Sequence, residues 1–216
     1  MTRLYKVNEI FKTMQGEGYH AGTPAIFIRF SGCNLWTGKE KDRAKNAKKN
    51  KATCPKWCDT EFVHGEPMTA GEIGAACLDL MDENDSDADI PLAVLTGGEP
   101  ALQVDDELIS VLKDVFKTVA IETNGTRKLK FDRSYVWVTV SPKTEPDQIK
   151  VWADEVKCVF PSLDPGKYKT IARHKFLQPL DEGNDGLWNR NLAVSYCLEH
   201  PQWRLSLQTH KILGLP

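Results

Sequence analysis

Three cysteines, Cys33, Cys54 and Cys58, lie in one stretch of the sequence with the spacing C-x20-C-x3-C. Residues 31–63 contain few apolar side chains, so packing in a hydrophobic core does not explain three thiols there. Thiolates bind soft metals, and three of them leave one iron of a four-iron cluster open to a further ligand. A structural zinc ion instead requires four protein ligands, and His64 is available as the fourth. The thiols alone favour neither metal over the other.

The composition limits the classes of protein to which the chain can belong. With 216 residues and 41% hydrophobic content, it builds one substantial core and leaves little room for a second full-sized domain. A formal net charge of −2 argues against a dedicated nucleic-acid binder, because phosphate contacts need clustered positive charge. No apolar run is long enough to cross a bilayer, and residues 1–10 lack the apolar stretch of a signal peptide. We therefore expect a cytoplasmic protein with neither a membrane nor a nucleic-acid partner.

The other three cysteines have a simpler explanation. Disulfides are rare in a reducing cytoplasm, and free cysteine is among the most buried residue types. Cys77, Cys158 and Cys197 lie in apolar helix or strand patterns. We therefore predict that all three are packing residues.

Short apolar segments alternate with amphipathic ones along the chain. Strands are expected at residues 25–30, 92–95, 119–122, 135–140, 155–160, 175–177 and 203–207. One helix begins at a capping box formed by Thr69 and Glu72, and two more are expected at 105–116 and 191–200. This alternation is typical of an α/β fold with a mainly parallel sheet.

Polar residues follow five of the expected strands at the point where each strand ends. They are Thr96-Gly97-Gly98-Glu99-Pro100, Glu122-Thr123-Asn124-Gly125, Ser141-Pro142-Lys143, Gln178-Pro179 and Gln208-Thr209-His210. Parallel α/β proteins bind ligands at the carboxyl ends of their strands. We therefore expect the five groups to face one pocket.

These residues together resemble a known family. Cys54-Pro-Lys-Trp-Cys58-Asp59-Thr60, Gly97-Gly98-Glu99-Pro100 and Ser141-Pro142-Lys143 are similar to motifs of the radical S-adenosylmethionine superfamily, and within it to the 7-carboxy-7-deazaguanine synthases. The same family is matched by Gln15-Gly16-Glu17-Gly18, Arg29-Phe30-Ser31-Gly32-Cys33-Asn34-Leu35-Trp36, Glu122-Thr123-Asn124-Gly125 and Gln208-Thr209-His210-Lys211. The superfamily commonly spaces its cysteines C-x3-C-x2-C. Here both gaps are longer, and Pro55 stands where the second ligand is expected.

The resemblance implies a fold and a reaction. The fold is a single α/β domain over residues 1–216, an abbreviated, partial TIM-like barrel with a mainly parallel sheet. The cofactors are a 4Fe–4S cluster, S-adenosylmethionine and Mg²⁺. The enzyme is a carbon–nitrogen lyase. It contracts the ring of 6-carboxy-5,6,7,8-tetrahydropterin by radical chemistry to 7-carboxy-7-deazaguanine, with loss of ammonia, in queuosine and deazapurine biosynthesis.

The resemblance also implies roles for individual residues. The metal ligands are Cys33, Cys54 and Cys58 for the cluster and Thr60 for Mg²⁺. The residues that bind S-adenosylmethionine are Trp57, Asp59, Gly98, Glu99, Ser141, Lys143 and Gln178. The residues that bind the pterin are Gln15, Glu17, Arg29, Thr96, His210 and Pro216. No further residue is assigned a catalytic role.

A basic insertion at about residues 37–53 separates the first two cysteines. Its lysines suit either docking of an acidic reductase such as flavodoxin or simple exposure to solvent, and charge pattern alone favours the second. The family resemblance further implies a homodimer.

Two other functions compete with the lyase. One is a different radical S-adenosylmethionine enzyme, such as a glycyl-radical activase. The other is a non-enzymatic zinc module in which Cys33, Cys54, Cys58 and His64 hold the metal and the lysines contact RNA.

Overall fold

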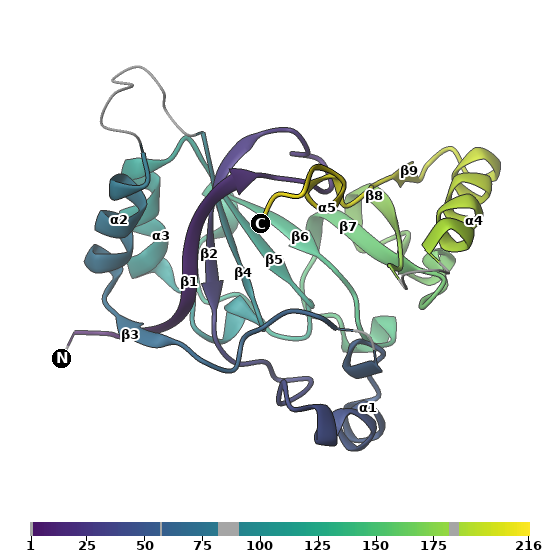
Figure 1. The fold of residues 1–216 in the computed structure, drawn as a ribbon, viewed down its shortest axis with the longest axis horizontal. Coiled ribbons are helices and arrows are strands. Elements are labelled where there is room, and N and C mark those ends of the chain that lie inside the picture. The colour runs from purple at the N-terminus through teal and green to yellow at the C-terminus, as the bar shows by residue number, and fades with distance from the viewer. Residues whose placement is uncertain (1, 57, 82–90, 182–185) are drawn as a thin grey trace.

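The computed structural model describes residues 2–56, 58–81, 91–181 and 186–216. Within these residues, nine strands form one sheet in the order β3-β1-β2-β4-β5-β6-β7-β8-β9 (Figure 1). β1 pairs antiparallel with β2 and with β3, and the other neighbouring pairs are parallel. The mainly parallel α/β fold expected from the sequence is therefore confirmed.

The strands are numbered in the order in which they occur along the chain. Their bounds are β1 (Tyr5–Met14), β2 (Pro24–Phe30), β3 (Glu66–Met68), β4 (Leu92–Gly97), β5 (Thr118–Thr123), β6 (Val136–Val140), β7 (Ala153–Phe160), β8 (Ala172–Pro179) and β9 (Arg204–Leu205). The seven strands expected from the sequence are all present. β9 is shorter than expected, with two residues instead of five.

The central strand β4 is buried on both faces. Ala93 and Leu95 pack into the main core, whereas Leu92 and Val94 pack into a separate cluster on the opposite face. Strands covered on both sides have continuous apolar sequences and no alternation. Such a run is the pattern by which the strand was predicted.

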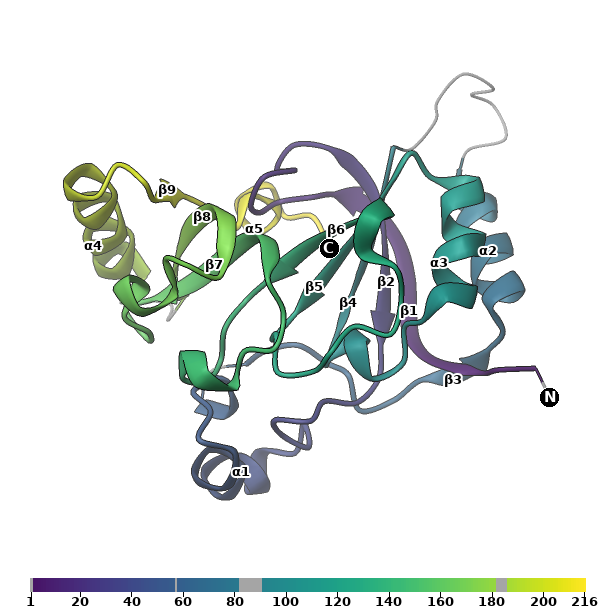
Figure 2. The same ribbon diagram turned by 180° about the vertical axis from the view of Figure 1, so that it is seen from behind.

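Two helices, α2 (Ala70–Asp79) and α3 (Asp106–Val115), lie side by side near the β1 end of the sheet (Figures 1 and 2). The predicted capping box is present, because the Glu72 N–H donates to the Thr69 hydroxyl and the Thr69 N–H donates to the Glu72 carboxylate. Asp105 caps α3 by accepting from the Leu108 N–H. Local sequence therefore determines where both helices begin.

A third helix, α4 (Gly186–Glu199), lies at the β8–β9 end of the sheet (Figure 2). It begins five residues before the expected helix. Cys158 is fully buried in the main core, as is Cys77, and Cys197 on α4 packs against that core. The packing role predicted for these three cysteines is confirmed.

Four elements are absent from the sequence-based expectation, and one of them is the three-residue strand β3. β1 buries only Tyr5 and Val7 among its ten residues, so its sequence does not alternate regularly. α5 (Thr209–Leu213) has only five residues. α1 (Arg43–Asn50) lies within the basic insertion. No helix in the described part of the chain is long and apolar enough to span a bilayer.

Candidate active site

A cavity of about 380 Å³ opens where the parallel strands end, as the polar residues after those strands predict. Side chains from β2, β4, β5, β7 and β8 line it, together with the cysteine segment and the C-terminal residues. All but two of the predicted site residues line this cavity. The exceptions are Trp57, which lies outside the described residues, and Glu99.

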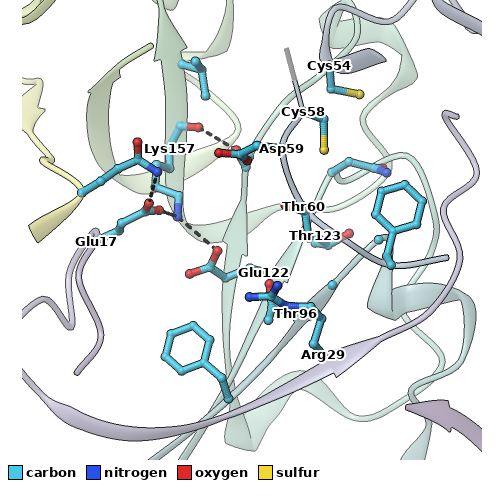
Figure 3. Close-up of a pocket in the computed structure, with 18 of the residues that line it drawn as sticks. Glu17, Arg29, Cys54, Cys58, Asp59, Thr60, Thr96, Glu122, Thr123 and Lys157 are labelled. Atoms are coloured by element: carbon cyan, nitrogen blue, oxygen red, sulfur yellow. Dashed lines mark hydrogen bonds and ion pairs between the residues drawn. The ribbon is translucent and has the colours of Figure 1, made fainter. Parts of the chain in front are cut away.

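The three thiols occupy one end of the cavity. Cys54 packs with Leu35 and Ala52 in a small apolar cluster, and Cys33 and Cys58 pack against the same cluster. Figure 3 shows the sulfur atoms of Cys54 and Cys58 at this end. Burial raises the pKa of Cys54 to about 12 and also raises that of Cys33. A cation bound between the thiols would reverse this trend by stabilising the thiolates.

A short turn accommodates the additional residue between Cys54 and Cys58. Residues Cys54–Lys56 form a short 3₁₀ turn, and the Cys58 N–H donates to the Cys54 carbonyl at 2.7 Å. The extra residue therefore adds to a turn and does not separate the two thiols across the cavity.

The strand ends and the cysteine segment are tied together by backbone contacts. The Glu99 N–H donates to the Gly32 carbonyl (2.9 Å), and the Thr53 N–H donates to the Lys143 carbonyl (2.8 Å). Gly98 lies against Gly32 so closely that a Cβ at residue 98 would lie 2.6 Å from the Gly32 carbonyl carbon. Only glycine allows this approach of the β4 end to the cysteine segment.

Glu99 follows Gly98 but lies behind the cavity wall. Its fully buried carboxylate accepts from the Thr123 hydroxyl (2.6 Å), the Asn124 N–H (2.7 Å) and the Ala101 N–H (3.0 Å). Burial raises its pKa, and these hydrogen bonds oppose the rise. In this structure Glu99 fixes the ends of β4 and β5, and its role toward S-adenosylmethionine remains a prediction.

Ser141 and Lys143 follow β6 on the opposite wall. The Lys143 ammonium donates to the Ser141 hydroxyl at 2.7 Å, and burial lowers the pKa of Lys143. Both side chains line the cavity beside the thiols, so they offer a cation and a hydroxyl to a bound ligand.

A buried ion-pair network forms the other end of the cavity. The Lys157 ammonium from β7 donates to the Glu17 carboxylate and, at 3.1 Å, to the Glu122 carboxylate (Figure 3). The Lys157 side chain is 4% exposed, and those of Glu17 and Glu122 are 12% and 19% exposed. Burial alone would raise the pKa of Glu17, but the Lys157 charge and its hydrogen bond outweigh burial and hold that pKa below its usual range.

Three glutamine amides complete the network. Gln178 (3.2 Å) and Gln208 (3.0 Å) donate to one oxygen of Glu17, while Lys157 occupies the other. Gln15 donates to Glu122 at 3.1 Å. Both oxygens of the Glu17 carboxylate, predicted to bind the pterin, therefore already accept hydrogen bonds within the protein. A carboxylate has about four acceptor sites, so Glu17 can accept a further N–H donor.

Four buried side-chain atoms have no partner within the described residues, and two of them belong to side chains that line the cavity. These two are Nε of Arg29 and Oε1 of Gln178. Arg29 also pairs with Glu9 at 2.9 Å and lies beside Thr96, its register partner across β2 and β4. An unsatisfied buried guanidinium nitrogen suits an anionic ligand.

The C-terminal segment covers the cavity beside Arg29. The Thr209 N–H and hydroxyl both donate to the Gly16 carbonyl, at 3.1 and 2.8 Å, and the Thr13 hydroxyl donates to the Pro216 carbonyl at 3.2 Å. His210 packs directly on Gly16, where a Cβ would meet the His210 backbone nitrogen at 2.8 Å. The C-terminus lies near the middle of both ribbon views, close to α5 (Figures 1 and 2).

The sequence analysis placed Glu122 and Gln208 among the groups expected to face the pocket but gave them no binding role, and it did not name Lys157. Lys157 and Glu155 are charged residues at alternate positions of a largely apolar strand, so they share one face. Two charges on one face of a buried strand indicate a polar cavity on that side. That signal was available in the sequence, but the partners of Lys157 were not.

The zinc module is disfavoured. The His64 side chain is exposed and does not line the cavity. In the portion of the chain with described coordinates, no group of three or more histidine, cysteine or acidic side chains is arranged to hold a metal ion. Zinc requires its sulfur ligands at about 2.3 Å from one point.

Comparison with known proteins agrees with this architecture. No model of a protein family matches the chain. The chain is 45% identical over 221 residues to a 7-carboxy-7-deazaguanine synthase of Caulobacter vibrioides, covering 98% of this chain and 99% of the relative. It is 44% identical to the protein of the same name from Bordetella pertussis, with the same coverage.

A solved structure shows the same fold. The crystal structure of QueE from Escherichia coli superimposes with a TM-score of 0.67 at 24% identity, covering 94% of this chain and 93% of that one. Identity above 40% across essentially the full length of the curated relatives goes further than fold. The chain belongs to the 7-carboxy-7-deazaguanine synthase family, enzymes of the radical S-adenosylmethionine lyase type.

Proposed function

We propose that this chain converts 6-carboxy-5,6,7,8-tetrahydropterin to 7-carboxy-7-deazaguanine and ammonia, using S-adenosylmethionine. The observation that carries the proposal is one cavity with three thiols at one end and, at the other, Arg29 and an acidic network. A redox cluster and a small polar anion require these two environments, and the cavity volume is in the range of small-molecule sites. The relatives' shared name supports the same reaction.

The donor set fits a 4Fe–4S cluster. Cys33, Cys54 and Cys58 would hold three irons, and the cavity leaves space for a ligand on the fourth. When bound, the cluster would supply the electron that cleaves S-adenosylmethionine to a radical able to abstract hydrogen from the pterin. The apolar contacts of Leu35 and Ala52 keep water from this end of the cavity.

We assign S-adenosylmethionine to the wall between the thiols and β8. Ser141 and Lys143 offer a hydroxyl and a cation, and Gln178 has a buried oxygen without a protein partner. Gly98 permits close backbone approach. We also propose that Asp59, Glu99 and Trp57 contribute to binding S-adenosylmethionine, as predicted from the sequence.

We assign the pterin to the opposite end. Arg29 receives its carboxylate, because the guanidinium has an unsatisfied buried nitrogen. The N–H donors of the pyrimidine edge face the carboxylates of Glu17 and Glu122. Gln15, Thr96, His210 and Pro216 surround the ring.

Mg²⁺ fits beside the cluster end. Thr60 and Asp59 present oxygen atoms to the cavity, and Mg²⁺ takes few protein ligands together with substrate and water oxygens. We propose that Thr60 is its protein ligand.

The remaining proposals concern the whole protein. Residues 1–216 form one radical S-adenosylmethionine domain that works in the cytoplasm, where six free cysteines remain reduced. It forms a homodimer. Support for this comes from α4, where Leu187, Val194 and Leu198 are exposed along one face beside the short edge strand β9.

An acidic reductase such as flavodoxin delivers the electron, and α1 is its docking surface. The helix contains no acidic residue, and Lys45, Lys48 and Lys49 are exposed on it. Arg43 at its start donates to the carbonyls of Pro55 (2.9 Å) and Cys58 (3.2 Å). The basic surface is thus fixed directly to the cysteine segment, which favours docking over simple exposure to solvent.

Anaerobic reconstitution tests the function. Iron and sulfide analysis should give one four-iron cluster, and turnover with the pterin should release 7-carboxy-7-deazaguanine. A reconstituted protein that cleaves S-adenosylmethionine but leaves the pterin unchanged would instead favour an activase. A colourless protein with one zinc ion would reject both.

A further inference from the structure

The Lys157 ammonium donates hydrogen bonds to two carboxylates that line the cavity. It comes from the middle of β7, so the sheet fixes its backbone between β6 and β8. Its side chain is almost completely buried and faces Glu17, from the loop after β1, and Glu122, from the end of β5. Three elements far apart in the sequence therefore meet at one ammonium group.

The charge balance of this group is unusual. Two carboxylates share one lysine, so the trio carries a net charge of −1 in a region largely removed from water. Without the lysine, burial and mutual repulsion would cause at least one carboxyl group to keep a proton. A protonated carboxyl presents an O–H donor where an ionised one presents only acceptors.

The other charged groups nearby do not replace Lys157. The Lys143 ammonium donates to the Ser141 hydroxyl. Glu155, on the same strand, accepts from the Tyr19 N–H (2.8 Å) and the Thr139 hydroxyl (2.9 Å), and burial raises its pKa. The groups whose charges act on the trio are Lys143, Glu155 and His210.

We propose that Lys157 is a positioning residue that keeps Glu17 ionised and holds Glu17 and Glu122 oriented as a paired acceptor for the N–H edge of the substrate. It does so without touching the reacting atoms. The orientation of the carboxylates toward the substrate rests on the proposed function. The ionisation of the carboxylate is a property of the protein without substrate. The two parts therefore have separate tests.

The first test needs no substrate. In the wild type, the Glu17 pKa lies below its value in the unfolded chain, so its stabilising effect is complete at neutral pH and is lost only in acid. In Lys157→Met, burial would act on Glu17 without the opposing lysine charge, so the Glu17 pKa would rise and the folded protein would hold a proton that the unfolded chain releases. Burial also raises the pKa of Glu99 and Glu155 in both proteins, so each loses some stability as pH rises. The stability of the variant should therefore fall more steeply than that of the wild type as pH rises from 6 to 8.

Thermal melting of the metal-free protein at several pH values measures this effect. Lys157→Arg should restore the wild-type profile because it restores the charge. Lys167→Met is the matched control, because it removes an exposed lysine that pairs with Glu145. If Lys157→Met does not fold, Glu17→Gln with Lys157→Met should recover folding. Parallel profiles for the wild type and Lys157→Met, or no recovery in the double variant, would overturn the proposal.

The second test uses the reconstituted enzyme. Lys157→Met should keep its iron and its substrate-free cleavage of S-adenosylmethionine, because the thiols lie at the other end of the cavity. Its KM for the pterin should rise about ten- to hundredfold at pH 7, with a smaller change in kcat, and the defect should shrink as pH rises. A KM defect that does not vary with pH would contradict the role of ionisation. A wild type that never turns over the pterin would reject the proposed function and leave the melting test valid.

Discussion

Replacing Gly98 by alanine tests how tightly the end of β4 is packed on the cysteine segment. The new Cβ would lie 2.6 Å from the Gly32 carbonyl carbon and 3.1 Å from the Cys33 nitrogen. These atoms belong to the backbone, so no side chain can rotate away. An ordinary carbon–carbon contact of about 3.5 Å requires the two segments to separate by roughly 1 Å.

The separation should lower the free energy of unfolding in two ways. Overpacking of this kind destabilises by about 1–3 kcal/mol. The separation also stretches two hydrogen bonds, Gly98 N–H to the Phe30 carbonyl (3.1 Å) and Glu99 N–H to the Gly32 carbonyl (2.9 Å). Each contributes about 0.5–1.5 kcal/mol. We therefore expect a loss of about 2–6 kcal/mol in the free energy of unfolding. Cys33 should also be displaced.

Urea unfolding of the metal-free protein measures the stability, and iron analysis after reconstitution measures the cluster. Gly71→Ala is the control, because Gly71 lies in α2 with no atom within 4 Å of its added Cβ. That change should stabilise by up to about 1 kcal/mol and leave iron content unchanged. If Gly98→Ala unfolds at the wild-type urea concentration and binds full iron, the contact is not rigid and the argument is wrong.

Three further changes probe separate parts of the site. Cys58→Ala should abolish cluster binding, whereas Cys197→Ala, on α4, should not; iron at the wild-type level in the first would contradict the ligand assignment. Extending the chain beyond Pro216 should impair turnover more than cluster assembly, because this residue lines the cavity, and unchanged kinetics in a tagged protein would oppose that placement. Reversing the charge of the three exposed lysines on α1 should slow turnover with flavodoxin but not with dithionite; equal loss with both would exclude docking there.

The sequence predicted those elements whose signals are local. The capping box of Thr69 and Glu72 lies within four residues and predicted where α2 begins. The continuous apolar run of β4 is equally local and predicted a buried strand. β1 was missed because its partners, β2 and β3, determine its conformation more than its own pattern does. α5 was missed because a five-residue helix has too little periodicity to detect.

The candidate site divides in the same way. Residue types and order along the chain were sufficient to predict one pocket, three thiols and the polar residues that line it. They were not sufficient to show that Glu99 lies behind the wall, because the side chain's direction depends on Thr123 and Asn124 of the next strand. Nor did they identify the Lys157 network, whose members come from β7, β5 and the loop after β1.

The sequence by itself determined which chemical groups are present and that parallel strands would bring them to one edge of a sheet, because strand and helix signals are short-range. Only the tertiary structure decided which of these groups form hydrogen bonds and ion pairs with one another. Lys157 meets Glu17 and Glu122 across gaps of 140 and 35 residues in the chain. Electrostatic interactions in a buried cavity depend on distance in space and on the exclusion of water, and both arise only when the sheet is assembled.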